Sequence, residues 1–227
     1  PASGRYAAMQ DMPTPVDDMV VAAYQDRFIY LISGWHDEGN VSLVQLYDTQ
    51  TDSWSEATAF PGKPVFGHAG GIAGDSIIVS DGVAVADKLV DGRRKFVAAK
   101  MTWRGDINPE QPTEITWRLV DAHSGKARYR MAAVGDDDGQ RVIFAGGGDN
   151  PYNYDGIGYD GVPSEPSGGY YAYNLETDRW QEKGRLAEPS MDHRGLLALA
   201  GKSGKDYYIV GGMDAEQKVI YPFLTGK

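Results

Sequence analysis

The sequence contains no cysteine. Disulfides, thiolate metal ligands and cysteine nucleophiles are therefore excluded. It also lacks any apolar run near the ~20 residues that a helix needs to span a bilayer. No phosphate-binding glycine loop, nucleophile elbow, His-Glu-x-x-His pair or dinucleotide-binding fingerprint is present. We therefore expect no membrane partner and none of the enzyme classes that these motifs identify.

Basic residues are scarce relative to acidic ones. The 22 Lys and Arg stand against 32 Asp and Glu, which gives a net charge of −10 and a pI of about 4.8. A surface this acidic repels phosphate backbones, so nucleic acid is not an expected partner. A chain without cysteine suits a periplasmic or secreted location, which we favour over the cytoplasm, although cytoplasmic bacterial proteins without cysteine also exist.

Short apolar runs recur along the chain. Four of them end in a glycine step, and each follows a second apolar stretch across a polar turn. The paired runs are residues 20–24 with 28–34, 69–73 with 76–82, 131–134 with 141–147, and 196–200 with 207–212. Two apolar runs around a polar turn predict a β-hairpin, and the closing glycines favour a backbone with positive φ.

A second phrase follows two of these hairpins. Tyr47-Asp-Thr-Gln-Thr-Asp-Ser-Trp54 and Tyr173-Asn-Leu-Glu-Thr-Asp-Arg-Trp180 both separate a Tyr from a Trp by six residues. The Thr-Asp pair predicts a turn between a third and a fourth strand, and the rings are expected to pack between neighbouring sheets. Hairpin, glycine step and Tyr/Trp phrase together resemble the kelch repeat. The resemblance implies an all-β fold, a kelch-type β-propeller of four-stranded antiparallel blades.

Two features depart from the kelch pattern. Ser33 and Asp81 stand where the repeat prefers the first glycine. In the second blade we expect the third and fourth strands at residues 96–103 and 114–120, around an insertion at 104–113.

The predicted blades account for the chain as a single domain. Residues 18–61, 62–122 and 123–189 form blades 1 to 3, residues 190–227 supply the inner three strands of a closing blade, and residues 1–17 supply its outer strand. Sharing a blade in this way removes exposed sheet edges. Kelch rings usually have more blades, so three arrangements stay open: a closed ring of about four blades, a homodimer that completes one ring, and a part of a larger ring.

The strand order predicts where a ligand binds. The residues before each first strand and the loops between second and third strands open on one face, around the channel mouth. Asp18, His68, Arg130, His193 and Arg194 lie there. We expect His68, Arg130 and Arg194 at one repeated structural position, where cationic groups attract a carboxylate. The alternative is that each arginine pairs with a nearby aspartate.

The longest connection on this face covers residues 148–168. Its Asn150, Tyr152 and Tyr154 are residue types that hold sugars by stacking and by amide hydrogen bonds. The same loop offers candidate oxygen ligands for Ca²⁺, although no downstream Glu completes an EF-hand: Asp149, Asn153, Asp155 and Asp160. A mobile polar loop is the alternative. Trp35, at the tip of blade 1, is expected either as an exposed stacking platform or packed against the adjacent blade.

A fold does not define a function. The kelch resemblance implies a binding scaffold without a cofactor, which recognises a protein or a carbohydrate at the channel mouth. Residues 66–79 are also similar to a stretch of the bacterial N-acetylneuraminate epimerase family of kelch mutarotases. That similarity implies an alternative, ring opening of an acidic sugar with Arg130 or Arg194 as the clamp and His68, His193 or Asp18 moving protons. Copper oxidation, known among kelch relatives, needs a Tyr–Cys crosslink that this chain cannot form.

Overall fold

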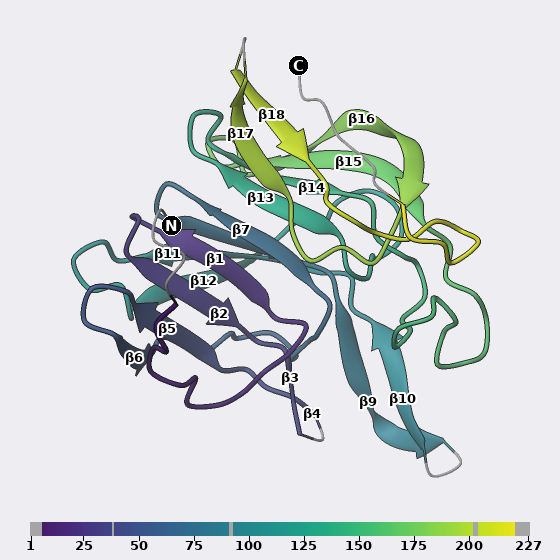
Figure 1. The fold of residues 1–227 in the computed structure, drawn as a ribbon, viewed down its shortest axis with the longest axis horizontal. Helices are drawn as coiled ribbons and strands as arrows, with labels where there is room; N and C mark the ends of the chain where they lie inside the picture. Colours follow the sequence, from purple (N-terminus) through teal and green to yellow (C-terminus); the bar gives the residue numbers. More distant parts are fainter. Residues whose placement is uncertain (1–5, 38, 91–92, 202–203, 221–227) are drawn as a thin grey trace.

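The computed structural model of the 227-residue chain describes residues 6–37, 39–90, 93–201 and 204–220 (Figure 1). Throughout these residues the regular structure is β-strand, with no helix and hence no helix able to cross a membrane. The predicted all-β class is confirmed. The sheets are antiparallel and follow one another along the chain, as a propeller requires.

Three sheets have four strands each, in the order expected of successive blades. Blade 1 contains β1 (Val20–Tyr24), β2 (Phe28–Ile32), β5 (Val44–Asp48) and β6 (Ser53–Glu56). Blade 2 contains β7 (Ala69–Ala73), β8 (Ser76–Ser80), β11 (Thr102–Ile107) and β12 (Ile115–Val120). Blade 3 contains β13 (Ala132–Asp136), β14 (Arg141–Ala145), β15 (Ser167–Asn174) and β16 (Arg179–Ser190).

The fourth blade is represented by a hairpin, β17 (Leu197–Gly201) and β18 (Gly204–Tyr208), followed by a bridge between Met213 and Val219. The expected third strand of this blade extends past residue 220 and so lies partly outside the described residues. Residues 6–16 contain no strand. Residues 10–16 lie against blade 1, where the Gln10 amide donates to Asp52 and the Thr14 amide to Gln45. The assignment of residues 1–17 to a closing blade stays a prediction.

The glycine steps have the predicted backbone. Ser33 and Gly34 have φ values of 56° and 106°, and Asp81 and Gly82 have 59° and 99°. The same pair of positive φ values recurs at residues 146–147 and 211–212. The first position is left-handed helical backbone, which Asp and Ser tolerate at a cost, whereas the second is nearly restricted to glycine. This explains why only the first glycine is replaced in blades 1 and 2.

The Tyr/Trp phrases occupy equivalent places, as predicted. Tyr47 pairs with Trp54 across β5 and β6, and Tyr173 pairs with Trp180 across β15 and β16. Each tyrosine hydroxyl donates to the aspartate of the intervening turn, Tyr47 to Asp52 at 2.6 Å and Tyr173 to Asp178 at 3.1 Å. Each Tyr/Trp phrase is thus a turn that is stabilised by a hydrogen bond between its own tyrosine and aspartate side chains.

A third tryptophan belongs to the same series. The indole N–H groups of Trp54, Trp117 and Trp180 all donate to a backbone carbonyl of the linker that enters their blade. The acceptors are the carbonyl oxygens of Gln10, Thr58 and Asp121. Sequence comparison misses Trp117 because its cross-strand partner is Gly105, where the other blades have tyrosine.

The prediction for the third strand of blade 2 was wrong. Residues 96–98 belong to an additional hairpin, β9 (Val83–Val90) with β10 (Arg93–Ala98), which projects from the loop face (Figure 1). The third strand is β11, so the insertion precedes it rather than following it. Both stretches are apolar and β-branched, and strand pattern alone does not tell an inserted hairpin from a blade strand. A smaller hairpin, β3 (Trp35–His36) with β4 (Gly39–Asn40), stands at the same face of blade 1.

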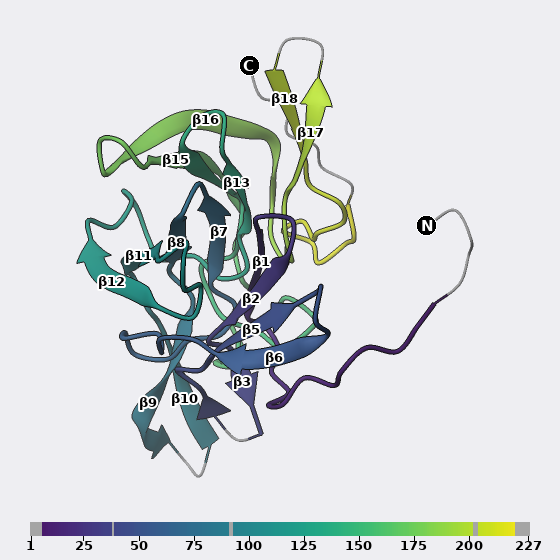
Figure 2. The ribbon, with the colours of Figure 1, turned by 90° about the vertical axis from the view of Figure 1, so that its left-hand side faces the viewer.

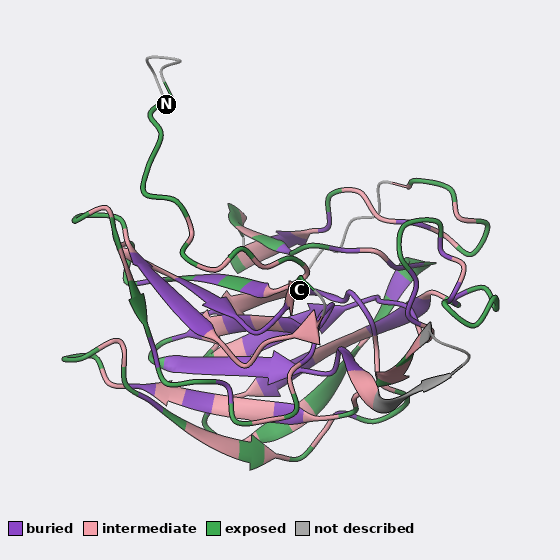
Figure 3. Ribbon diagram, turned by 90° about the horizontal axis from the view of Figure 1, so that it is seen from below, coloured by how far each residue is buried: buried purple, intermediate pink, exposed green. Residues whose placement is uncertain are grey.

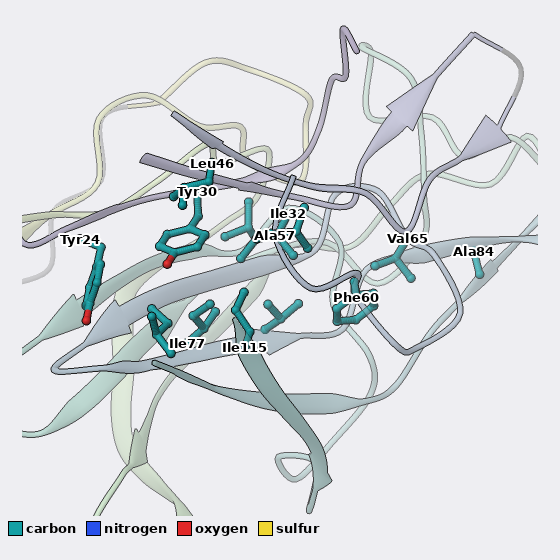
Figure 4. Packing of buried hydrophobic residues seen from close by; sticks show 14 residues of the cluster. Tyr24, Tyr30, Ile32, Leu46, Ala57, Phe60, Val65, Ile77, Ala84 and Ile115 are labelled. Carbon is teal, nitrogen blue, oxygen red and sulfur yellow. The ribbon is translucent and has the colours of Figure 1, made fainter. Parts of the chain in front are cut away.

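Apolar side chains fill the seams between successive blades. Figure 4 shows the seam between blades 1 and 2, where Tyr30 and Ile32 meet Ile77 and Ile115. The seam between blades 2 and 3 is filled around Phe144, and that between blades 3 and 4 is filled around Ile143 and Tyr207. A fourth cluster lies beneath the loop face and contains Phe66, Val83, Tyr129, Tyr152, Met191 and Met213. Burying these side chains is the main force that holds separate sheets together.

Candidate functional site

One left-handed residue precedes the first strand of every blade. Asp18, Gly67, Arg130 and Asp192 have φ values of 47°, 60°, 53° and 63°. Backbone hydrogen bonds link three of them, since the Gly67 amide donates to the Asp18 carbonyl at 2.8 Å and the Arg130 amide donates to the Gly67 carbonyl at 2.7 Å. In blade 4 the His193 amide, next to Asp192, donates to the Arg130 carbonyl at 3.1 Å. These four positions define the mouth, and Asp192 was not anticipated from the sequence.

The expectation that His68, Arg130 and Arg194 share one structural position was wrong. Arg130 is equivalent to Gly67, while His68 follows that position by one residue. The hairpin register of blade 4 shows one additional residue between Asp192 and Leu197, because Leu197 pairs with Tyr208 three residues before the glycine step. In blade 2 the corresponding pair is Gly71 with Ile78. Arg194 therefore lies two residues after Asp192, the mouth position of blade 4, in the part of the chain that contains the inserted residue.

Arg130 is buried and its donors are occupied. Its Nε lies 3.1 Å from Asp18 Oδ2, and its Nη1 lies 2.9 Å from both Asp192 Oδ1 and the Asn153 carbonyl oxygen. The guanidinium also covers the rings of Tyr129 and Tyr152 at 4.6 and 5.4 Å. Burial lowers its pKa, but the hydrogen bond to Asp18 and the neighbouring charges outweigh burial, so the pKa is raised. Arg130 holds the mouth together as a permanent cation.

Arg194 differs from Arg130 in exposure. Its side chain is 59% exposed, against 8% for Arg130. It donates to Asp192 Oδ1 at 3.0 Å, and its Nε lies 3.8 Å from Asp18 Oδ1. These contacts use part of its five-donor fork and orient the rest toward solvent. Arg194 is therefore the arginine of the mouth that can meet an anion without breaking a buried network.

The two histidines next to the mouth are buried and neutral. His68 Nε2 lies 2.8 Å from the carbonyl oxygen of Ile32, which only accepts, so Nε2 carries the proton. His193 Nε2 lies 3.0 Å from the hydroxyl of Ser190. Burial lowers the pKa of each imidazole to about 4, because the charged form loses its hydration. Such groups are poor proton shuttles at neutral pH.

The long loop after β14 is fixed by its own hydrogen bonds. The Asn150 amide donates to Asp160 and to the Val162 carbonyl, both at 2.9 Å. Tyr152 is fully buried in the cluster beneath the loop face, whereas Tyr154 is 77% exposed. Of the three predicted sugar-binding residues, only Tyr154 presents a free ring to solvent. Its neighbour Asn153 contacts Arg130, so Tyr154 stands close to the mouth.

The candidate calcium ligands of this loop do not converge on one point. The carboxylate of Asp149 accepts from Lys126 and from the Glu165 amide. Asp155 accepts from the Ile157 amide, Asp160 accepts from Asn150, and Asn153 contacts Arg130 through its carbonyl group. Within residues 6–220, apart from the undescribed gaps, no group of three or more His, Asp or Glu side chains is arranged to hold a metal ion.

The Trp35 ring packs against other aromatic side chains and is not an exposed stacking surface. Its ring contacts Phe66 and Phe96 with centroid separations of 5.5 and 6.0 Å, and the guanidinium of Arg94 lies 5.1 Å from its centroid. Its indole N–H donates to the Asp37 carbonyl. Of the two interpretations that the sequence left open, the contacts favour packing against the adjacent blade.

A cavity of about 580 Å³ extends inward from the mouth between the four inner strands. Asp18, His68, Arg130, His193 and Arg194 line its charged end. Farther in, the wall is made mostly of small and apolar residues of β1, β7, β13 and β17, and Asp26, Asp137 and Lys205 lie at the opposite end. The space is large enough for one sugar-sized ligand.

Comparisons with known proteins identify no family for this chain. No family model matches the sequence, and no curated protein matches it. The solved structure of YjhT is similar to this chain, with 13% identity and a TM-score of 0.46 over 96% of this chain and 83% of that one. A similarity this remote does not indicate a ligand or an activity for this chain.

Proposed function

We propose that this chain is a kelch-repeat binding scaffold that takes an acidic ligand, a carboxylated carbohydrate, at the channel mouth. The observation that carries the proposal is the half-exposed Arg194 at the rim of a cavity of about 580 Å³. A guanidinium binds a carboxylate through two parallel hydrogen bonds, and this pairing is strongest where water is partly excluded. Tyr154 adds an exposed ring for stacking against a pyranose.

Binding is supported better than proton transfer. Opening a sugar ring requires a general acid and a general base near the anomeric oxygen. The groups that would move protons are engaged elsewhere: Asp18 is held by Arg130, and His68 and His193 are buried with pKa values lowered to about 4. The mutarotase alternative therefore finds no free acid–base pair among the described residues of the mouth.

The test is calorimetric titration with two matched ligands, methyl glucuronoside and methyl glucoside, which differ only in the carboxylate. We expect the acidic ligand to bind at least tenfold more tightly. Arg194→Ala should abolish this preference, while Arg179→Ala, which removes an exposed arginine of β16, should leave it unchanged. Equal affinity for both ligands, or binding unaffected by Arg194→Ala, would overturn the proposal.

The enzyme alternative has its own readout. Freshly released α-sialic acid relaxes to the β anomer spontaneously, and NMR follows the rate. We expect the protein to leave this rate unchanged at stoichiometric concentration. A rate that rises in proportion to protein concentration would replace the scaffold proposal with the mutarotase alternative.

A further inference from the structure

One backbone hydrogen bond recurs where each of the first three blades meets the next. The second residue of each glycine step donates its amide to a carbonyl of the linker that enters the following blade. The pairs are Gly34 with Val65 at 2.9 Å, Gly82 with Arg128 at 3.3 Å, and Gly147 with Ser190 at 2.9 Å. Each acceptor stands two residues before the mouth position of the following blade, so these contacts, which we call the step junctions, fix where that blade begins.

The first residue of each step gives its junction a different side chain. In blade 1 the hydroxyl oxygen of Ser33 accepts from the Val65 amide at 3.1 Å. In blade 2 the Oδ2 atom of Asp81 accepts from the Arg128 amide at 2.7 Å. In blade 3 the position is Gly146, which has no side chain. The same junction is therefore closed by a neutral hydroxyl in blade 1 and by a carboxylate in blade 2.

A buried imidazole completes the step junction of blade 2. His123 Nε2 lies 2.6 Å from Asp81 Oδ2, and its Nδ1 lies 2.6 Å from the carbonyl oxygen of Ser124. The rings of Tyr171 and Trp180 in blade 3 lie against the imidazole, both at centroid separations of 5.3 Å. The His123 and Asp81 side chains are 1% and 0% exposed. Both belong to the buried interior, which is purple in Figure 3, although they lie in connecting segments rather than in strands.

Both contacts of the imidazole are hydrogen bonds only if the ring carries two protons. A carbonyl oxygen and a carboxylate can only accept, and a neutral imidazole donates through one nitrogen alone. The geometry therefore indicates an imidazolium at His123 beside an ionised Asp81. Burial lowers the pKa of His123, but the hydrogen bond to Asp81, the charge of Asp81 and the Ser124 carbonyl outweigh burial, so the pKa is raised.

The carboxylate of Asp81 depends on His123 for its counter-charge. Its Oδ1 atom is buried without a hydrogen-bond partner, and His123 is its only ion-pair partner among the described residues. Loss of the imidazolium proton therefore leaves a buried negative charge uncompensated and one of the two 2.6 Å contacts without a hydrogen. A buried charge that loses its partner strongly destabilises a folded protein.

The other titratable groups around the ring do not replace Asp81. From blade 2, the amine of Lys100 donates to a backbone carbonyl of the linker, and its positive charge lowers the pKa of His123. From blade 3, Tyr171 contributes a ring contact. From the linker itself, Arg128 donates through its amide, and its Nε is buried without a hydrogen-bond partner. Asp81 and His123 thus set the proton state of this junction.

We infer that the Asp81–His123 pair is a pH-sensitive switch, which holds the linker of residues 121–128 against the end of blade 2 while it is protonated and releases the linker in base. The strand that follows this linker, β13, lies beside β7 of blade 2 (Figure 2). Arg128 stands two residues before Arg130, so the switch acts on the junction that positions the buried arginine of the mouth. The inference does not depend on which ligand the mouth binds.

The direction of the pH effect follows from the raised pKa of His123. A histidine whose pKa is raised by folding stabilises the folded chain fully below the ordinary value of 6.5, and this stability is lost as the pH rises through the raised value. His68 and His193, with pKa values of about 4, are neutral throughout this range. The step junction of blade 1 is closed by the Ser33 hydroxyl and should not respond to pH in this range.

The proton state can be measured in the unmodified protein. We expect nitrogen-15 NMR at pH 7 to show both ring nitrogens of His123 protonated, with titration to the neutral ring centred above pH 6.5. His68, whose Nε2 donates to a carbonyl, should show one protonated nitrogen in the same spectrum. A His123 ring with a single protonated nitrogen at pH 7 would overturn the switch.

The response of the junction can be measured by hydrogen exchange of two equivalent amides. The Arg128 amide donates to Asp81, and the Val65 amide donates to Ser33, which makes it an internal control. Between pH 7 and pH 9, after correction for the intrinsic exchange rate, we expect the protection of Arg128 to fall at least tenfold relative to that of Val65. An unchanged ratio would overturn the inference.

A matched variant gives blade 2 the chemistry of blade 1. Asp81→Ser with His123→Gln keeps an acceptor for the Arg128 amide and removes both titrating groups. We expect the ratio of Arg128 to Val65 protection in this variant to be independent of pH. A ratio that still falls in base would assign the effect to another group and overturn the switch. If the variant does not fold, the two measurements on the unmodified protein still decide.

Discussion

Three seams of this propeller are held by buried apolar side chains, whereas the fourth, between blades 4 and 1, is bordered by exposed ones and joined by charges at the mouth. The inner strands of all four blades consist mainly of small and apolar residues. What differs is whether the facing strand is near enough to bury them. The sequence therefore provides apolar side chains on the inner strands, but these side chains stabilise the fold only where a neighbouring blade is close enough to bury them.

The largest contrast should come from large-to-small substitutions in a closed and an open seam. Phe144→Ala removes a fully buried ring between blades 2 and 3, and we expect a loss of about 3–5 kcal/mol in the free energy of unfolding. Leu199→Ala removes a half-exposed side chain and should cost less than about 1 kcal/mol. Urea unfolding measures both, and equal losses would show that the fourth seam is as well packed as the others.

Arg130 and Arg194 allow a second comparison, between a buried and an exposed arginine of the mouth. Arg130→Met removes the buried cation between Asp18 and Asp192 and leaves only the exposed Arg194 beside them, and removing one partner of a buried ion pair costs about 3 kcal/mol or more. Arg194→Met, at an exposed site, should cost less than about 1 kcal/mol. The measurement is again the free energy of unfolding. A similar small loss for both variants would show that the charged cluster does not hold blades 1 and 4 together.

Acid should lower the stability of both the seam between blades 1 and 2 and blade 4. His68 bonds across the seam to Ile32, and His193 lies in blade 4, each with a folded pKa of about 4 against an ordinary value near 6.5. A lowered histidine pKa means that the unfolded chain binds the proton first. The stability that the two neutral histidines contribute is therefore present above pH 6.5 and is lost as the pH falls toward 4.

The loss should reach up to about 3 kcal/mol for each histidine. His68→Gln keeps a donor for the Ile32 carbonyl and removes one titration, so the acid-induced fall in melting temperature should become shallower. A fall of unchanged steepness would mean that other groups cause it.

Much of this fold follows from the sequence because its signals are local. Hairpins, glycine steps and the Tyr47 and Tyr173 turns depend on residues close in the chain, and they were found where predicted, except that the second strand of blade 4 lies at Gly204–Tyr208 rather than in the run 207–212. Blade 2 was misassigned because Gly105 stands opposite Trp117, which hides the phrase, and because the inserted hairpin has the composition of a blade strand.

The mouth was less predictable for a physical reason. Its repeated feature is a backbone conformation, not a side-chain type, so Asp18, Gly67, Arg130 and Asp192 share a position without resembling one another. Three of these four are residue types that tolerate positive φ or are enriched there, and an alignment on that property would have found Asp192. Charge alone grouped His68 with Arg194, although His68 follows the mouth position of its blade by one residue and Arg194 by two.

Hydrogen exchange of the inner strands tests most directly whether the four seams differ. Amides of β7 (Ala69–Ala73), between two closed seams, should exchange only through near-global unfolding, whereas amides of β17 (Leu197–Gly201) should exchange through a local opening at least tenfold faster. Equal protection of the two strands would contradict the account, because it would mean that blade 4 is held as firmly as the blades on either side of β7.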